Sequence, residues 1–230
     1  MPLFDHLSDE ALDDILASAG TRLYPAGTAV FEQGQAADSF YVLLHGRLRV
    51  SQVTPEGQQV IVRIVNPGDL FGIAKVLQRT DYPGTATAAT ESLALVWPMS
   101  SWDAMLERHP FLAVNAMKTV GSRLMDSHAR VRELATEAVE RRVAHTVLRL
   151  ANQSGRKEAE GIRIDFPVSK QDIAEMAGTT LYTVSRILSA WEAAGIVAGG
   201  RQKLLLKDPH RLVLIGDGLV DAPSPGRRGS

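Results

Sequence analysis

The chain has 230 residues, of which 45% are hydrophobic and 22% charged, the composition of a globular protein with one large or two small domains. It contains no cysteine, which excludes disulfides, iron–sulfur clusters, cysteine-ligated zinc and a thiolate nucleophile. No apolar run approaches the roughly 20 residues that cross a membrane, and the first residues are acidic where a signal peptide would be basic. We therefore expect a cytoplasmic protein without a membrane partner.

The net charge of -1 conceals an uneven distribution along the chain. Residues 1–136 hold 11 Lys and Arg against 15 Asp and Glu, a net charge of -4, whereas residues 137–230 hold 14 against 11, a net charge of +3. A basic C-terminal part indicates a polyanionic partner.

A short N-terminal helix is predicted after Ser8, a suitable N-cap. From near Arg22 to Pro98, short β-rich runs alternate with glycine turns, a pattern typical of a β-sandwich or a small barrel. The predicted strands are residues 29–31, 39–44, 48–53, 59–65, 85–89 and 93–97.

A long helix is predicted to begin at Pro110, because proline is favoured at the first position of a helix. Apolar and small residues then recur in steps of four and three, which is a heptad pattern and predicts a coiled coil between two chains. An amphipathic helix that covers the β domain of its own chain is the alternative, and different faces could serve both purposes. The seam comprises Ala113, Met117, Val120, Leu124, Ser127, Val131, Leu134 and Ala138.

The C-terminal part reads as a second helix (137–152), a polar loop (154–160) and then two short helices separated by Gly178. The first short helix follows the N-cap Ser169, and the second begins with residues 179–188, which together make a helix-turn-helix. Residues 195–197 and 204–206, joined through Gly199, Gly200 and Arg201, predict a two-stranded wing.

The second short helix has the features of a DNA recognition helix. Val184, Ile187 and Leu188 are spaced to face inward, whereas Arg186 is expected to face outward and bind guanine O6 and N7 through both arms of its guanidinium. A helical hairpin with a surface arginine is the alternative. The predicted DNA-binding residues are Ser169, Lys170, Thr179, Thr180, Tyr182, Ser185, Arg186 and Lys203.

Over residues 3–215 the chain resembles the Crp/Fnr family of transcription regulators. The resemblance rests on Gly27, Phe31, Gly34, Asp38, Tyr41, Gly46, Arg47, Gly68–Gly72, Asp172–Ala174 and Thr183–Leu188. It implies an α+β fold with an N-terminal β jelly roll of the cyclic-nucleotide-binding type, a long dimerisation helix and a C-terminal winged helix-turn-helix. The expected divisions are an effector-sensing domain (1–108), the dimerisation helix (109–136), the DNA-binding domain (137–215) and a disordered tail (216–230).

The departures from the family pattern bear on the effector. Ile73 and Gly84 stand where members that bind cyclic AMP have a glutamate for the ribose and an arginine for the phosphate, so we expect no cyclic AMP binding. Tyr182 replaces the usual glutamate of the recognition helix, so the operator should differ at one base pair of each half-site. The string from Leu181 to Arg186 is most similar to the branch that responds to nitrogen oxides.

The expected effector pocket is mostly apolar and fits a small gas, a haem or an uncharged molecule. Its predicted lining is Arg63, Phe71, Gly72, Ile73, Thr85, Thr87, Val120, Leu124, Ser127 and His128. Haem is one possible cofactor, although a surface imidazole is the favoured interpretation of His45 and a histidine of the dimer interface that of His128. The candidate iron ligands are His6, His45, His128, Met117 and Met125.

The sequence thus predicts a homodimeric regulator, provisionally an activator, that binds an inverted-repeat operator in double-stranded DNA and acts on RNA polymerase. An enzyme is not expected, because the β region contains one histidine, too few for the metal site of a jelly-roll enzyme. The alternatives are a ligand-binding regulatory module without specific DNA binding and a regulator without an effector, controlled by its abundance.

Overall fold

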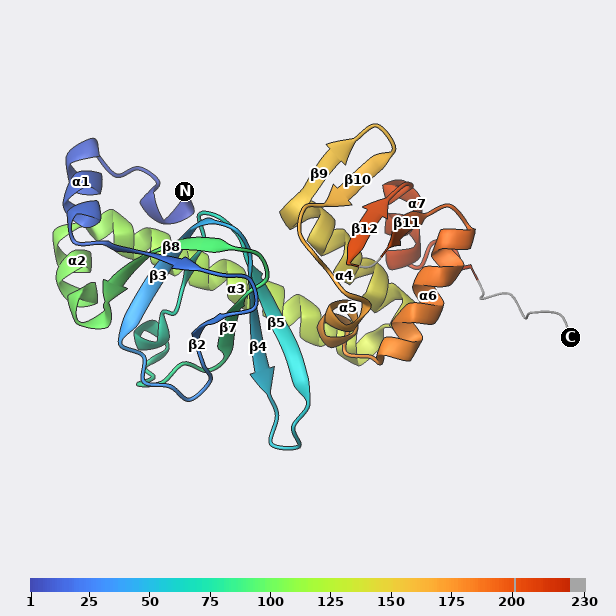
Figure 1. The fold of residues 1–230 in the computed structure, drawn as a ribbon, viewed down its shortest axis with the longest axis horizontal. Coiled ribbons are helices and arrows are strands. Elements are labelled where there is room, and N and C mark those ends of the chain that lie inside the picture. The colour runs from blue at the N-terminus through green and yellow to red at the C-terminus, as the bar shows by residue number, and fades with distance from the viewer. Residues whose placement is uncertain (201, 224–230) are drawn as a thin grey trace, which may run out of the picture. The chain divides into compact units, whose positions relative to one another are not determined.

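The computed structural model describes residues 1–200 and 202–223, and the chain forms two compact units, Met1–His128 and Ala129–Ser230 (Figure 1). Part of the predicted tail (224–230) and Arg201 of the predicted wing turn lie outside the described residues. None of the helices in the described ranges is long and apolar enough to span a membrane.

The first unit contains two four-stranded antiparallel sheets, which confirms the predicted jelly roll. One sheet has the order β1-β8-β3-β6 and the other β2-β7-β4-β5. The strands are β1 (Gly20–Tyr24), β2 (Ala29–Phe31), β3 (Ser39–His45), β4 (Leu48–Val53), β5 (Gln59–Val65), β6 (Leu70–Phe71), β7 (Thr85–Ala88) and β8 (Ser92–Pro98). The six predicted strands match six of these closely. Strands β1 and β6 were not predicted, and β6 has only two residues, too few to reveal a period.

Strand β3 supplies both cores of this unit, because successive side chains point to opposite faces of a sheet. Tyr41 and Leu43 belong to an aromatic-rich cluster with Phe31 and Phe71, in which the rings of Tyr41 and Phe71 stack at 5.0 Å. Phe40 and Val42 belong to a second cluster, in which the ring of Phe40 stacks on Trp97 at 5.4 Å. Since both faces are buried, β3 has no polar side to reveal its alternation.

Helices cover the second of these clusters. They are α1 (Asp9–Ala17), α2 (Trp102–Arg108) and the first half of α3 (Pro110–Thr136), with the 3-10 turns η1 (Pro2–Phe4), η2 (Ala74–Leu77) and η3 (Met99–Ser101) between elements. Ser8 caps α1 by accepting a hydrogen bond from the Ala11 N–H, as predicted. The carboxylate of Asp14 on α1 contacts His109 Nε2 at 2.8 Å and Arg108 Nη1 at 3.1 Å, which holds α1 to the corner where α2 ends.

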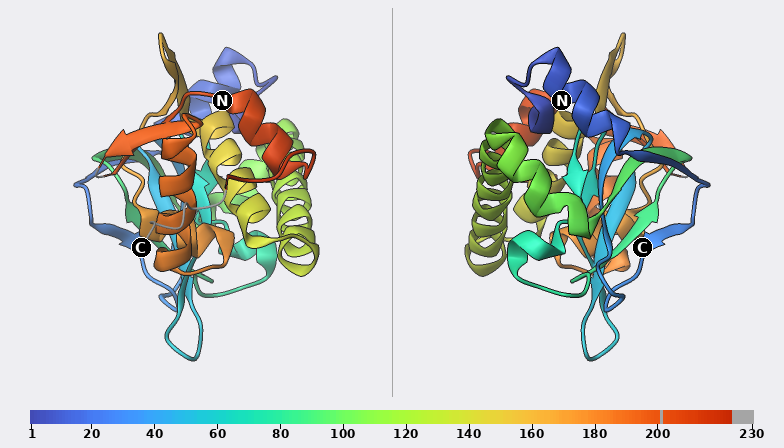
Figure 2. Two further views of the ribbon diagram at one scale, coloured as in Figure 1. Left: turned by 90° about the vertical axis from the view of Figure 1, so that its right-hand side faces the viewer. Right: turned by 90° about the vertical axis from the view of Figure 1, so that its left-hand side faces the viewer.

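The second unit contains four more helices and one sheet. Helix α4 (Val139–Ser154) packs against α5 (Lys170–Ala177) and α7 (Pro209–Gly216), and α5 packs against α6 (Leu181–Ala193), as Figure 2 shows. The sheet comprises β9 (Gly155–Glu158), β10 (Gly161–Ile164), β11 (Val197–Gly200) and β12 (Lys203–Leu206) in the order β11-β12-β10-β9.

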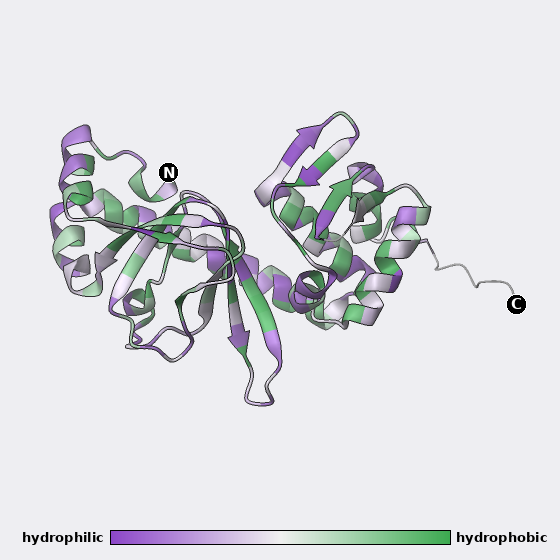
Figure 3. Cartoon of the chain, in the orientation of Figure 1, coloured by the Kyte–Doolittle hydropathy of each residue, from purple (hydrophilic) through white to green (hydrophobic). Residues whose placement is uncertain are grey.

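The predicted wing forms, because β11 and β12 pair as an antiparallel hairpin, and β10 and β9 extend it to a four-stranded sheet. The prediction of a loop at 154–160 is wrong, because this segment contains β9. Strand β9 lies at the edge of the sheet, all four of its residues are exposed, and Figure 3 colours it as hydrophilic. An edge strand that is wetted on both faces carries no apolar alternation, so its composition is that of a loop. Strand β9 pairs with β10, and an ion pair between Arg163 Nε on β10 and Glu158 Oε1 on β9, at 2.6 Å, joins the two strands.

Candidate nucleic-acid interface and effector site

The helix-turn-helix is built from local capping interactions. Ser169 Oγ accepts a hydrogen bond from the Asp172 N–H at 3.0 Å, and Asp172 Oδ2 accepts one from the Ser169 N–H at 2.7 Å, a capping box at the start of α5. The helix ends at Gly178, whose φ of 62° and ψ of 50° lie in the left-handed region that glycine adopts without strain. Helix α6 then begins behind Thr180, whose hydroxyl accepts from the Thr183 N–H at 3.2 Å.

The orientation of α6 agrees with its sequence. Val184, Ile187 and Leu188 are buried as predicted, and Tyr182 and Arg186 are exposed. An exposed arginine near the start of this helix can bind a planar pair of acceptors such as guanine O6 and N7.

The other predicted DNA-binding residues surround this face or lie on the sheet. Ser185 is half-buried and its hydroxyl lies 3.4 Å from Lys170 Nζ, so these two side chains contact each other across α5 and α6. Thr179 is half-buried in the turn, and Lys203 is exposed at the start of β12. The hydroxyl oxygens of Ser169 and Thr180 accept backbone hydrogen bonds, which leaves hydroxyl hydrogens as the groups they can offer to a phosphate.

Arginines from two other helices hold the turn. Neither was among the residues predicted for the DNA-binding site. The guanidinium of Arg142 on α4 donates to the carbonyls of Ala177 at 3.1 Å, Gly178 at 3.2 Å and Glu137 at 2.9 Å. Arg130 on α3 donates to the carbonyl of Met176. The carbonyls of Met176, Ala177 and Gly178 end α5, where a positive charge is favourable.

A carboxylate balances the charge near this arginine cluster. Glu133 is buried and accepts hydrogen bonds at 2.6 and 2.8 Å from Arg149 Nη1, while Arg149 Nη2 donates to Thr146 Oγ1. Burial and the neighbouring Arg149 lower the pKa of Arg130, and the carboxylate of Glu133 opposes that shift. The three charged groups thus form one network beside the helix-turn-helix.

The predicted effector residues do not share one surface. Phe71 is buried in the aromatic-rich cluster between the sheets, whereas Ile73 is buried in the cluster under the helices, although only Gly72 separates them. Gly72 has φ of 73°, and a Cβ there would lie 2.8 Å from the Tyr41 ring, so this position accepts only glycine. Phe71 and Ile73 thus act primarily as core residues.

The threonines of the predicted pocket lie on β7. Thr85 Oγ1 accepts a hydrogen bond from the Gln33 N–H at 3.0 Å, and Thr87 pairs with Arg49 of β4. A Cβ at the preceding Gly84 would lie 2.7 Å from the carbonyl oxygen of Ser51. A side chain at position 84 would therefore require β4 to move.

A cluster of charged groups joins β5, β6 and α3 in the first unit. Arg63 Nη2 lies 2.7 Å from Asp69 Oδ2, which also accepts the Asn66 N–H at 2.9 Å. Arg123 of α3 donates to the carbonyl of Leu70 beside them. Burial, and next the charge of Arg63, lower the pKa of Arg123 to about 9. The cluster therefore holds two guanidiniums and one carboxylate, and it carries an excess positive charge.

Arg123 was missed in the sequence, although a signal was present. It lies between Val120 and Leu124, and the Ser127 hydroxyl donates to its carbonyl at 2.9 Å. Arg123 flanks the seam residue Leu124 and is half-buried. Its position one turn before the predicted pocket residues Ser127 and His128 would have indicated the site.

The predicted seam divides between two faces of α3. Val120 packs on the core under the helices, because this part of the helix covers the jelly roll. Met117 is 72% exposed, Leu124 54% and Val131 64%, and Leu134 is exposed as well. Phe111 and Val114 extend the exposed apolar stripe toward the start of the helix, and Ser127 and His128 are also exposed.

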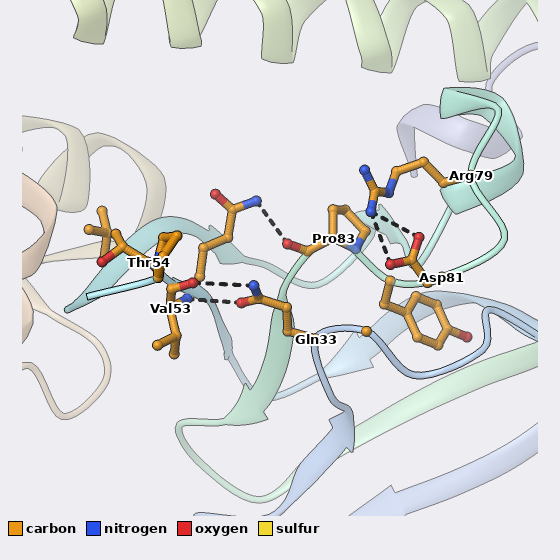
Figure 4. Close-up of a pocket in the computed structure, with 11 residues that line it drawn as sticks. Gln33, Val53, Thr54, Arg79, Asp81 and Pro83 are labelled. Atoms are coloured by element: carbon orange, nitrogen blue, oxygen red, sulfur yellow. Dashed lines mark hydrogen bonds and ion pairs between the residues drawn. The ribbon is translucent and has the colours of Figure 1, made fainter. Parts of the chain in front are cut away.

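A separate cavity of about 540 Å³ lies beside the turn of the β4–β5 hairpin (Figure 4). Gln33 donates to the Val53 carbonyl at 3.3 Å and accepts the Val53 N–H at 2.8 Å, while Arg79 pairs with Asp81 at 2.9 Å on the opposite wall. The predicted effector residues are not part of its lining, which includes Gln33, Gly34, Gln52, Val53, Thr54, Pro55, Val60, Arg79, Asp81, Tyr82 and Pro83.

The candidate haem ligands lie at exposed positions. His6 pairs with Asp5 at 3.4 Å, and His45 is exposed at the end of β3. Met117, Met125 and His128 are exposed along α3. In residues 1–200 and 202–223, no three or more His, Cys, Asp or Glu side chains gather into a group that could hold a metal ion.

Comparison with known proteins agrees with this arrangement. Residues 21–109 match the cyclic nucleotide-binding domain family, and residues 141–215 match the Crp-like helix-turn-helix domain family. The chain is 29% identical over 219 residues to the cyclic AMP receptor protein of Thermus thermophilus, covering 95% of this chain and 98% of the relative. It is 27% identical over 213 residues to the global nitrogen regulator of Synechocystis, covering 89% of this chain and 95% of that relative.

Among solved structures, FixK2 of Bradyrhizobium japonicum has the same fold, with a TM-score of 0.75 at 22% identity over 85% of this chain and 96% of FixK2. A third relative, 24% identical over 82% of this chain and 84% of its own length, is named a CRP-like cAMP-activated global transcriptional regulator, of Mycobacterium tuberculosis, and a Crp-like helix-turn-helix implies DNA binding. With a cyclic nucleotide-binding domain followed by this motif, and relatives matched over nearly their full length, the chain belongs to the Crp/Fnr family of DNA-binding transcription regulators.

Proposed function

We propose that the chain is a homodimeric, sequence-specific regulator that binds an inverted-repeat operator and whose jelly roll senses an effector other than cyclic AMP. The observation that carries the proposal is the exposed arginine on a capped recognition helix, Arg186, with Lys203 exposed on the adjoining sheet. The domain divisions expected at residues 108, 136 and 215, RNA polymerase as a partner, a cytoplasmic location and an activating role belong to the same proposal.

The exposed apolar stripe of α3 supports the dimer. Met117, Leu124 and Val131 are seven residues apart, the heptad spacing, and each is more than half exposed. Large apolar side chains at this spacing on a helix are typical of a parallel two-chain contact. A second copy of α3 would remove them from water.

A twofold dimer requires a twofold operator. We propose that paired α6 helices enter successive major grooves about 34–36 Å apart, one helical turn of DNA. Arg186 would bind a guanine, and the hydroxyls of Ser169 and Thr180 would contact phosphates. The half-site would differ from that of relatives with a carboxylate at position 182, because a phenol does not accept the cytosine amino group as a carboxylate does.

Two positions support the exclusion of cyclic AMP. Ile73 is buried among apolar side chains, so it offers no acceptor for a ribose hydroxyl. Gly84 is packed against the Ser51 carbonyl, which leaves no room for an arginine at that position without a shift of β4. Relatives named for cyclic AMP and for nitrogen regulation match the chain at 29% and 27% identity, so their names do not distinguish the effectors.

The charged cluster of Arg63, Asp69 and Arg123 favours an effector with an anionic group over an uncharged one. Two guanidiniums beside one carboxylate leave one positive charge without a partner in a partly buried place, and an anion there would gain charge-assisted hydrogen bonds. Nitric oxide sensed through haem is the competing proposal, consistent with the nitrogen-oxide branch. An absorption spectrum after haem addition, with and without nitric oxide, tests it: a Soret band shifted by the gas is expected if haem is the sensor.

Cyclic AMP is tested by thermal shift at millimolar concentration. We expect no change in the melting temperature, because neither half of the nucleotide has its recognition group. A rise of several degrees that disappears in Arg63→Met would show that this arginine replaces the missing phosphate ligand.

DNA reading is tested by a pair of variants. Arg186→Ala should weaken operator binding by roughly 1–3 kcal/mol per half-site and relax the preference for guanine at one position. Lys203→Ala should weaken binding to all sequences alike. It should also lower the slope of log affinity against log salt concentration by about one in magnitude. If Arg186→Ala lost the same amount of affinity for operator DNA and for random DNA, Arg186 would be a phosphate contact, and its role in base recognition would be refuted.

A further inference from the structure

The recognition helix places two large apolar side chains in water at its first turn. Leu181 is 49% exposed and Tyr182 is 77% exposed. Further along α6, Val184, Ile187 and Leu188 are all buried. The apolar residues of α6 thus fall into an inward group, which packs the fold, and an outward pair at the N-terminal end.

Folding does not explain this outward pair. The first turn of a helix favours acidic side chains because of the helix dipole, and α6 has none there. The N-cap hydrogen bond is supplied by Thr180, so neither Leu181 nor Tyr182 is required to start the helix. Polar residues at these two positions would keep the same helix at a lower exposure of apolar surface.

The surroundings of the pair indicate what it contacts. Tyr182 and Arg186 are four residues apart and so lie on one face of the helix. Lys170 of α5 reaches the same helix at Ser185. An apolar pair among cationic side chains at the N-terminus of a recognition helix suits the major groove, where the C5 methyl of thymine is the apolar group among hydrogen-bonding base edges.

We infer that Leu181 and Tyr182 read thymine methyl groups, and that this contact sets part of the operator sequence. The inference rests on the proposed DNA-binding function. Residues 181 and 182 precede Arg186 by four to five residues, about 6–7.5 Å along the helix axis. The thymines should therefore lie within about two base pairs of the guanine bound by Arg186.

The test removes the methyl group and changes nothing else. An operator is first selected from random duplexes with the full chain, and each thymine of the half-sites is then replaced by deoxyuridine. Burying one methyl group corresponds to about fourfold in affinity, so symmetrical replacement in both half-sites should cost about fifteenfold at the positions that are read. Replacement at other thymines should have no effect.

The variants assign the contact. Leu181→Ala should bind the thymine and deoxyuridine operators with the same affinity at one of these positions, and Tyr182→Ala should do so at the same or an adjacent one. Val213→Ala, which shortens an exposed aliphatic side chain on α7 of the same unit, is the matched control and should keep the full deoxyuridine penalty. Retained binding to random DNA shows that each variant is folded.

The outcomes separate this inference from the proposed function. If the wild-type chain selects no sequence, the proposed function fails. If it selects an operator but no deoxyuridine replacement weakens binding, or if the penalty persists in both Leu181→Ala and Tyr182→Ala, the inference is overturned while the function stands.

Discussion

The contact of Arg142 with the end of α5 yields a quantitative prediction about the helix-turn-helix. Its guanidinium donates to the carbonyls of Ala177, Gly178 and Glu137 at 3.1, 3.2 and 2.9 Å. Arg142→Met keeps most of the aliphatic stem and removes all three donors. The variant therefore isolates the hydrogen bonds from the packing.

The expected cost follows from the burial of the three acceptors. Ala177 is buried, so its carbonyl would lose its partner without gaining water, at about 1–3 kcal/mol. Gly178 is exposed and Glu137 half-buried, so water can replace most of those two bonds. The local free energy of opening of α5 and the turn should fall by roughly 2–3 kcal/mol in total.

Hydrogen exchange measures this change where it occurs. A loss of roughly 2–3 kcal/mol should make the amides of α5 and the turn exchange about 30- to 150-fold faster under conditions where exchange reports the opening equilibrium. Arg132→Met, at an exposed position of α3, is the matched control and should exchange as the wild type does. Exchange within threefold of wild type in Arg142→Met, or an equal effect of Arg132→Met, would refute this account of how the turn is held.

Two further predictions concern the first unit and α3. Replacing Leu124 and Val131, exposed by 54% and 64%, with glutamate should give monomers by light scattering and abolish operator binding, since four charges would meet at the seam; persistent dimers would refute the role of this stripe. The hydrogen bond from His109, with the charge of Arg108, lowers the pKa of Asp14. A depressed folded-state pKa contributes stability above the unfolded value and loses it as the pH falls through the folded one, so Asp14→Asn should lower the melting temperature at neutral pH and match the wild type well below pH 3.8. A difference that stays constant with pH would exclude this ion pair as its source.

Features carried by local interactions could be predicted from the sequence. The N-cap of α1, the start of α3 at Pro110, the capped α5 and the buried face of α6 all depend on residues within one or two turns of each other. Helix α7 was not predicted, although it has a local signal: Asp208 accepts a hydrogen bond from the Arg211 N–H, and Pro209 follows Asp208. The patterns themselves indicated a sandwich or small barrel followed by a helix-turn-helix, and the resemblance to the Crp/Fnr family implied the jelly roll.

The charged cluster of Arg63, Asp69 and Arg123 and the support of the helix-turn-helix were decided only by the tertiary structure. Arg123 meets Leu70, and Arg142 meets Ala177, over separations of 53 and 35 residues, and nothing in either local pattern specifies such a partner. Phe71 and Ile73 both read as pocket residues, but the bend at Gly72 sends them into different cores. Strand β9 is a strand only because β10 pairs with it. Sequence alone determined the elements whose hydrogen bonds join residues close together in the chain. Contacts between distant segments depend on how the sheets and helices pack, because that packing decides which side chains meet.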